Sequence, residues 1–295
     1  MERQQLEQSI KKTLARFDVF DFPLTDFELW QFLDLKISYK ELRDFLKENK
    51  LIQKEGFYFL KGREDLIETR QNRYREANKK IILAYKKIKL ISWLPWIKLI
   101  CLANIIGPHN LKRESDLDLF IVTKNNRLWL TKLIATILVA LMHWRPTEQR
   151  SADQLCLSFL VDESSLNLSD CLIDENDWYF NYWLAGLRPL YGDEKTYQKL
   201  LLENAWLNKK LPNWQSPYLK IQKFFNRKSI SKKSFTIFNI FEKISKKINY
   251  LLMSEEIKTK ANKTSSVIVS DHLLKLHTFD RRLEIFKRAE EKLNS

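Results

Sequence analysis

The chain has 295 residues, 44% of them hydrophobic, which is enough for two or three domains with real cores. Its five glycines do not cluster, and this excludes a Walker A loop and a GxGxxG dinucleotide turn. Its three cysteines form no CxxC pair, which argues against a structural zinc site and suits a reducing cytosol. The polar start of the chain does not resemble a secretory signal, so we expect a cytoplasmic protein.

The net charge of +14 is unevenly distributed. Residues 220–263 contain 12 Lys or Arg against 3 Asp or Glu. Such a basic field attracts phosphate backbones or anionic lipid, although it is also compatible with a solvated lysine-rich surface that has no partner. We therefore treat a nucleic acid, RNA or DNA, as a possible partner.

Residues 1–62 predict three helices followed by a β-hairpin. Thr25 with Glu28, and Ser38 with Glu41, have the spacing of capping boxes that begin the second and third helices. This order of elements is typical of a winged helix.

A winged helix can read DNA with its third helix, or it can serve as a protein–protein or dimerisation module. Five residues are available for DNA contacts: Tyr39, Lys40, Arg43, Lys47 and Lys50. Acidic side chains interleave with them and weaken the attraction for phosphate. Residues 63–92 predict a long charged helix, which we interpret as a structural connector.

An apolar run of 17 residues, 128–144, raises the question of a membrane span. A spanning helix needs about 20 apolar residues, and Lys132 lies inside this run. We expect a buried core helix and no membrane partner.

The pattern that carries chemistry lies at residues 96–122. A β-branched run ends at Gly107, a polar loop follows, and Asp116 and Asp118 open a second apolar strand. Because a strand repeats its facing every second residue, the two carboxylates project from the same face. Two carboxylates this close repel unless a cation lies between them, so the pattern predicts one or two Mg²⁺ ions that bind phosphates.

A third carboxylate is expected on the next strand, residues 154–161. Asp153 stands at its start and is the candidate general base or second metal ligand. The alternative is an ordinary loop aspartate.

Several segments together resemble bacterial nucleotidyltransferase-like proteins of the DNA polymerase β superfamily that carry an N-terminal winged helix. The matching segments within residues 13–215 are 18–24, 107–124, 127–129, 153–158 and 204–206. The resemblance implies a nucleoside triphosphate (NTP) as substrate, Mg²⁺ held by Asp116 and Asp118, and catalysis by these two with Asp153. It also implies a nucleotide-binding loop formed by Gly107, His109, Asn110, Lys112, Arg113 and Ser115.

One position departs from the family pattern. Pro108 stands where the superfamily has a serine, and it offers neither a hydroxyl nor an N–H to a phosphate. His109, Asn110, Lys112 and Arg113 could supply side-chain donors in its place. The departure also supports an alternative, in which the domain has lost catalysis.

The C-terminal third predicts mostly helices. An aromatic cluster at 178–183 is either core or a base-stacking surface, and we favour core. Residues 257–270 read as a polar segment and 271–293 as a helix, with His272 and His277 at the surface.

The sequence thus predicts a helix-rich α+β protein with a winged-helix domain (1–62), a connecting helix (63–92), a nucleotidyltransferase-like domain with a small mixed sheet (93–215) and a basic helical C-terminal region (216–295). The expected function is transfer of a nucleoside monophosphate from an NTP to a hydroxyl of RNA or protein with Mg²⁺. The alternative is a decayed transferase that serves as a winged-helix DNA-binding regulator or scaffold.

Overall fold

The structure is a computed structural model that describes residues 3–49, 53–103, 109–147, 149–218 and 232–294, with side chains in the last range described from residue 238. Helices and two sheets make up this part of the chain, so the predicted helix-rich α+β class is confirmed.

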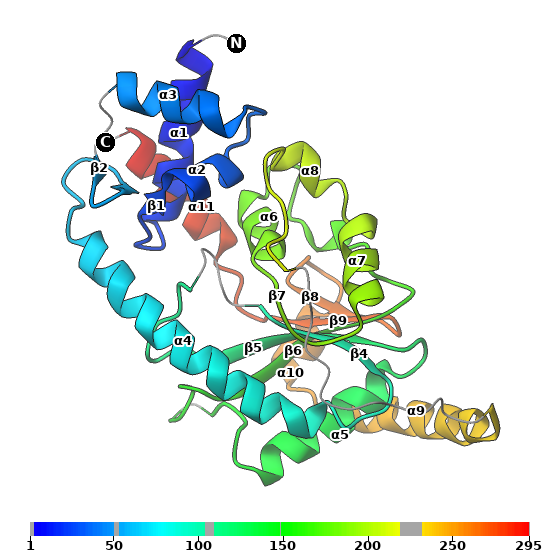
Figure 1. Cartoon of the computed structure of the whole chain (residues 1–295). Helices are drawn as coiled ribbons and strands as arrows, with labels where there is room; N and C mark the ends of the chain where they lie inside the picture. Colours follow the sequence, from blue (N-terminus) through cyan, green and yellow to red (C-terminus); the bar gives the residue numbers. More distant parts are fainter. Residues whose placement is uncertain (1–2, 50–52, 104–108, 148, 219–231, 295) are drawn as a thin grey trace.

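The N-terminal part contains three helices and a small antiparallel sheet with strand order β1-β3-β2 (Figure 1). Its elements are α1 (Arg3–Asp18), β1 (Leu24–Thr25), α2 (Asp26–Phe32), α3 (Tyr39–Glu48), β2 (Gln53–Lys54) and β3 (Phe57–Tyr58). Both predicted capping boxes are formed, at the starts of α2 and α3. Glu55 and Gly56 turn the hairpin with φ values of 55° and 81°, the left-handed backbone that two-residue hairpin turns require.

A long helix, α4 (Leu66–Ile91), leads to a six-stranded mixed sheet with strand order β7-β4-β5-β6-β9-β8. Its strands are β4 (Ile97–Leu102), β5 (Leu117–Thr123), β6 (Leu155–Asp162), β7 (Arg188–Gly192), β8 (Val267–Val269) and β9 (Leu273–Leu276). The β5–β6 pair is parallel and the other pairs are antiparallel. The parallel pair is joined by the crossover helix α5 (Leu128–Leu141).

Alternating side chains of this sheet enter two cores, as the two-residue period of a strand requires. Phe120 and Val122 belong to one core, together with residues of α1 and α6 (Trp178–Ala185). Leu119 and Ile121 belong to the other core, together with residues of α4 and α5. The sheet is therefore covered by helices on both faces, and α7 (Glu194–Glu203) and α8 (Leu207–Lys210) lie on the α6 side (Figure 1).

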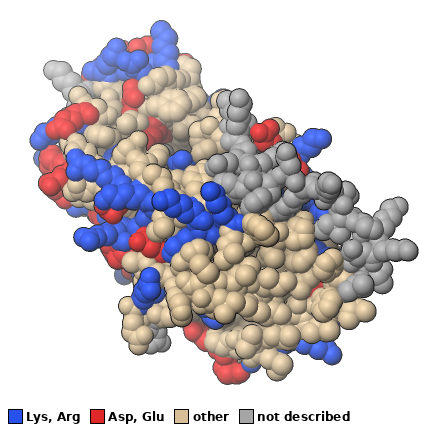
Figure 2. Space-filling model, turned by 60° about the horizontal axis from the view of Figure 1, so that its bottom comes forward, with Lys and Arg blue, Asp and Glu red and all other residues tan. Residues whose placement is uncertain are grey.

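The run at 128–144 forms α5, which is only partly buried. Trp129 and Ala135 are buried, whereas Ile137 and Leu141 are exposed. Within the described residues, no helix is both long and apolar enough to span a bilayer. The face formed by α5 and α9 (Lys232–Leu252) includes a broad uncharged area beside Lys and Arg side chains (Figure 2).

The C-terminal region differs from the prediction, because it is not purely helical. After α9 and α10 (Glu255–Lys260), strands β8 and β9 form a hairpin whose second strand pairs with β6. The helix predicted over 271–293 begins only at α11 (Arg282–Asn294). The apolar residues Leu273 and Leu274 that suggested one helical face lie in β9, where they are buried against the sheet.

Helix α11 returns to the start of the chain and lies along α1 (Figure 1). Lys292 of α11 forms an ion pair with Asp18 at the end of α1, and Arg63 binds the same carboxylate at 2.9 Å. Arg282 at the start of α11 contacts Asp177, the N-cap of α6, at 2.6 Å. The last helix is thus fixed both to the N-terminal part and to the helical layer over the sheet.

Candidate functional site

The two aspartates of the Asp-x-Asp motif lie together at the start of β5. Asp118 is in the strand and Asp116 comes directly before it. Each offers a carboxylate oxygen to a group whose ligand atoms all lie within 4.8 Å of one another. The sequence therefore predicted this juxtaposition correctly.

The third member of the group is Cys156, which the sequence analysis did not select. It lies opposite Asp118 in the register between the parallel strands β5 and β6. Directly after this pair, the partner of Phe120 is Phe159, so β6 has one extra residue there. A bulge of this kind bends a strand and redirects its side chains, and it is common beside functional sites.

Burial raises the pKa values of all three members of this group. Burial, and then the neighbouring Asp116, raises the pKa of Asp118 to about 7. Burial also raises the pKa values of Asp116 and of the Cys156 thiol. Closely spaced acidic groups removed from water resist joint ionisation, and a bound cation reverses that penalty.

Asp153 is not among the three grouped ligands. Its carboxylate accepts a hydrogen bond from the buried Lys80 of α4 at 2.6 Å, and its carbonyl accepts one from Lys87 at 2.6 Å. Lys80 also donates to the carbonyl of Ser115 at 2.7 Å and lowers the pKa of Asp116 against the effect of burial. This geometry gives Asp153 a role in joining the starts of β5 and β6 to α4.

The residues predicted to bind the nucleotide fall into two sets. Asn110, Lys112 and Ser115 line one cavity. His109 instead packs against Tyr74, with ring centroids 4.6 Å apart, and lies 3.4 Å from Arg188, while Arg113 is exposed. Gly107, like Pro108, lies outside the described residues.

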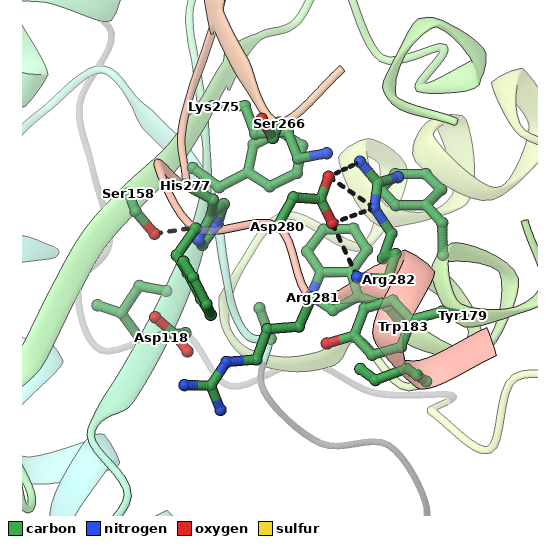
Figure 3. Close-up of a pocket in the computed structure, with 16 residues that line it drawn as sticks. Asp118, Ser158, Tyr179, Trp183, Ser266, Lys275, His277, Asp280, Arg281 and Arg282 are labelled. Carbon is green, nitrogen blue, oxygen red and sulfur yellow. Dashed lines mark hydrogen bonds and ion pairs between the residues drawn. The ribbon is translucent and has the colours of Figure 1, made fainter. Parts of the chain in front are cut away.

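A cavity of about 230 Å³ opens beside Asp118 (Figure 3). Its wall is largely aromatic on the α6 side, where Tyr179 and Trp183 line it. These two residues of the predicted aromatic cluster are half-buried, whereas Trp178, Phe180 and Tyr182 are core, as predicted.

The β9–α11 segment forms another wall of this cavity. His277 is half-buried, with its ring nitrogen 3.2 Å from the Ser158 hydroxyl, whereas His272 is exposed as predicted. Burial lowers the pKa of His277 to about 4, which keeps the imidazole neutral near pH 7. Arg281 extends into the space between Asp118 and Tyr179 in the view of Figure 3.

A second cavity, of about 280 Å³, shares Tyr179, Trp183 and Arg281 with the first. Three cationic side chains line it without forming an ion pair to an acidic residue in the described part of the chain: Lys112, Arg281 and Arg288. Arg73 also lines it but is paired with Asp21 at 2.9 Å. The two cavities are thus neighbours that share lining residues: Asp118 lines the first, and the second carries these three cations together with Asp21 and Glu284.

Sequence reasoning missed the contributions of α4 and α11. Lys80 and Lys87 stand seven residues apart among the apolar positions of α4, and a lysine within an apolar helical face is a signal of a buried contact. No comparable local signal marks Arg281 and Arg288, because only the tertiary position of α11 brings them to the cavity.

No protein-family model matches this chain, and comparison with curated proteins and with solved structures finds no match either. The site is therefore interpreted from its own geometry and chemistry.

Proposed function

We propose that this protein is a metal-dependent nucleotidyltransferase that transfers a nucleoside monophosphate from an NTP to an acceptor hydroxyl. The observation that carries the proposal is that the paired aspartates lie beside a cavity whose neighbour is lined by three cations. Asp118, grouped with Asp116, lines the first cavity, and Lys112, Arg281 and Arg288, which form no ion pair within the described residues, line the second. A triphosphate needs both, because a metal ion bridges phosphate oxygens while side-chain cations neutralise the rest of its charge.

The two carboxylates fit a divalent ion such as Mg²⁺, which proteins hold through one or two carboxylates together with substrate phosphates. When bound, such an ion supplies charge neutralisation at the reacting phosphate and lowers the pKa of a bound hydroxyl. Asp116 and Asp118 are the residues that would hold it.

The chain's own residues would bind and orient the nucleotide. Lys112, Arg281 and Arg288 would contact the triphosphate, and the rings of Tyr179 and Trp183 offer a stacking surface for the base. The acceptor hydroxyl would then lose its proton to solvent as its oxygen forms a bond to the α-phosphorus, and pyrophosphate would leave with the electrons of the broken P–O bond. The basic C-terminal region favours RNA as the acceptor over protein.

The alternative, a DNA-binding winged helix beside an inactive domain, has less support from the contacts. The order of elements in the N-terminal part suits a winged helix. However, two cations of its third helix are paired with acids: Arg43 with Asp26 at 3.5 Å, and Lys40 with Asp44 at 3.5 Å. These pairs reduce the positive charge available to a phosphate backbone.

The test is a labelling reaction with an NTP carrying ³²P at the α-position, a divalent cation and cell extract. Relative to extract alone, the wild-type protein is expected to label an additional acceptor, and the same NTP labelled at the γ-position should add no label, because pyrophosphate leaves. Ribonuclease or protease sensitivity then identifies the acceptor as RNA or protein.

Matched variants test whether loss of labelling or of NTP binding is specific to substitutions in the site. Asp118→Asn should abolish labelling, whereas Asp170→Asn, which changes an exposed aspartate elsewhere, should not. Arg281→Met should weaken NTP binding about tenfold, as expected for loss of one charge-assisted contact, and the exposed Arg75→Met should have no effect. Wild-type protein that labels no acceptor with any of the four NTPs, while binding duplex DNA through Arg43 and Lys47, would favour the alternative.

A further inference from the structure

The Asp116–Asp118–Cys156 group contains one ligand that does not suit Mg²⁺. Mg²⁺ takes hard oxygen ligands and keeps near-octahedral geometry, whereas thiolate selects softer ions. The sulfur of Cys156 nevertheless lies with the two carboxylates in a group whose ligand atoms are all within 4.8 Å of one another. A third carboxylate at this position would have completed an oxygen-only site.

The position of Cys156 is determined by the sheet. It is the register partner of Asp118 on the adjacent parallel strand, immediately before the extra residue in β6. Side chains of paired residues on neighbouring strands project from the same face, so the thiol and the Asp118 carboxylate lie side by side. The arrangement therefore follows from backbone pairing.

The group is also accessible to small ions. Asp118 lines the cavity of about 230 Å³, Cys156 lines another of about 240 Å³, and Ser158 lines both. Two of the three ligands, Asp118 and Cys156, thus each line a cavity. Three protein ligands with an open position toward a cavity is the pattern of catalytic zinc sites.

We propose that Cys156 makes this group a site for a borderline-soft divalent cation, with Zn²⁺ preferred over Mg²⁺. Cys156 binds as the thiolate, and its proton is released to solvent when the ion enters. The inference extends the metal role of the proposed function, but it does not depend on which group is transferred.

The test uses the metal-free full-length protein and Co²⁺ as a spectroscopic substitute for Zn²⁺. Co²⁺ bound to a thiolate gives a strong near-ultraviolet sulfur-to-metal charge-transfer band, which oxygen ligands do not give. We expect one equivalent of Co²⁺ to produce this band and one equivalent of Zn²⁺ to remove it, while a large excess of Mg²⁺ leaves it unchanged.

Variants at Cys156 test the assignment without reference to activity. Cys156→Ser should abolish the band and weaken Zn²⁺ binding by about 100-fold. Loss of a residue that only hydrogen-bonds to a metal ligand can already weaken metal binding by this factor. Cys156→Asp should restore an oxygen-only group and reverse the preference toward Mg²⁺. Cys171→Ala, a change at a cysteine outside the group, should retain the band.

Two outcomes overturn the inference in different ways. Co²⁺ that binds without the charge-transfer band, or Zn²⁺ affinity unchanged in Cys156→Ser, would refute the thiolate ligand and leave the proposed nucleotidyl transfer intact. Failure of every divalent ion to bind the wild-type protein would refute both. Circular dichroism of each variant confirms that the comparison is made between folded proteins.

Discussion

The ammonium of Lys80 donates to the carboxylate of Asp153 at 2.6 Å and to the carbonyl of Ser115 at 2.7 Å. Ser115 immediately precedes the Asp-x-Asp motif, and Asp153 lies two residues before the first residue of β6, Leu155. The backbone completes this junction, because Asp153 donates its N–H to the same Ser115 carbonyl at 3.0 Å. One buried side chain of α4 therefore sets the spacing between the strands that carry the candidate ligands.

Lys80→Met should destabilise the protein and loosen this junction. Its side chain is 3% exposed, while that of Asp153 is 45% exposed, so solvent can partly replace the lost ion pair. We expect a loss of about 1–2 kcal/mol in the free energy of unfolding, measured by urea denaturation. Lys79→Met, whose parent side chain is 72% exposed, is the matched control and should change stability by less than about 0.5 kcal/mol. Equal effects of the two substitutions would contradict the role given to Lys80.

The local features of the fold could be predicted because they depend on short-range chemistry. The caps at Thr25 and Ser38, and the common facing of Asp116 and Asp118, each follow from residues a few positions apart. The aromatic cluster was also correctly predicted as mainly core, because large apolar rings are usually buried.

Features that depend on long-range pairing could not be predicted. Leu273, Leu274 and Leu276 fit either a helix face or a short strand, and only pairing with β6, more than 100 residues earlier, selects the strand. The same pairing brings His277 and Arg281 to the cavity beside Asp118. Cys156 was missed because its importance comes from its register with Asp118 and not from any local motif.

Asp118→Asn should stabilise the metal-free protein at pH 8 and change it little at pH 4. Burial and Asp116 raise the folded-state pKa of Asp118 to about 7, so between pH 4 and 7 the folded state binds a proton that the unfolded state has lost. The wild-type protein therefore loses stability as the pH rises through this window, and an uncharged asparagine removes that loss. With about 1.4 kcal/mol per unit of pKa shift, we expect a gain of about 2–4 kcal/mol at pH 8.

The measurement is urea denaturation of both proteins at several pH values in the presence of a chelator. Added divalent ion should reduce the difference, because the ion compensates the buried charge of the wild-type protein alone. A gain that does not vary with pH would contradict the predicted titration.

Arg281 and Arg282 are adjacent, but their substitution by methionine should affect different properties of the protein: nucleotide binding for Arg281 and stability for Arg282. Arg282 is buried and donates to Asp177 at 2.6 Å and to the carbonyl of Cys171 at 2.9 Å, so its loss leaves Asp177 as a buried unpaired charge. Arg282→Met should therefore cost about 3–5 kcal/mol of stability. Arg281→Met should change stability by less than about 0.5 kcal/mol while weakening nucleotide binding.

Thermal unfolding and nucleotide binding by equilibrium dialysis, carried out on both variants, distinguish the two roles. A stability loss in Arg281→Met as large as that in Arg282→Met would mean that Arg281 is structural. It would then remove this residue from the cations that are proposed to bind the triphosphate.

Lys132→Met should stabilise the protein near pH 7. The ammonium of Lys132 lies within α5 and donates to the carbonyl of Leu157 at 2.6 Å, and burial lowers its pKa to about 8. Between pH 8 and about 10.5 the unfolded state therefore binds a proton that the folded state has released, so wild-type stability rises with pH across this window. The buried charge is a net cost below pH 8, and methionine fills the same space without it. After subtracting about 1 kcal/mol for the lost hydrogen bond, we expect a gain of about 2–3 kcal/mol at pH 7.

The gain should disappear by pH 10.5, where Lys132 is uncharged in the folded state and about half charged in the unfolded state, so that little of the burial cost remains. Lys209→Met, which changes an exposed lysine of α8, serves as the control and should show no such dependence on pH. Urea denaturation at pH 7 and pH 10.5 provides the comparison. Destabilisation by Lys132→Met at both pH values would show that the bond to the Leu157 carbonyl outweighs the cost of burying the ammonium.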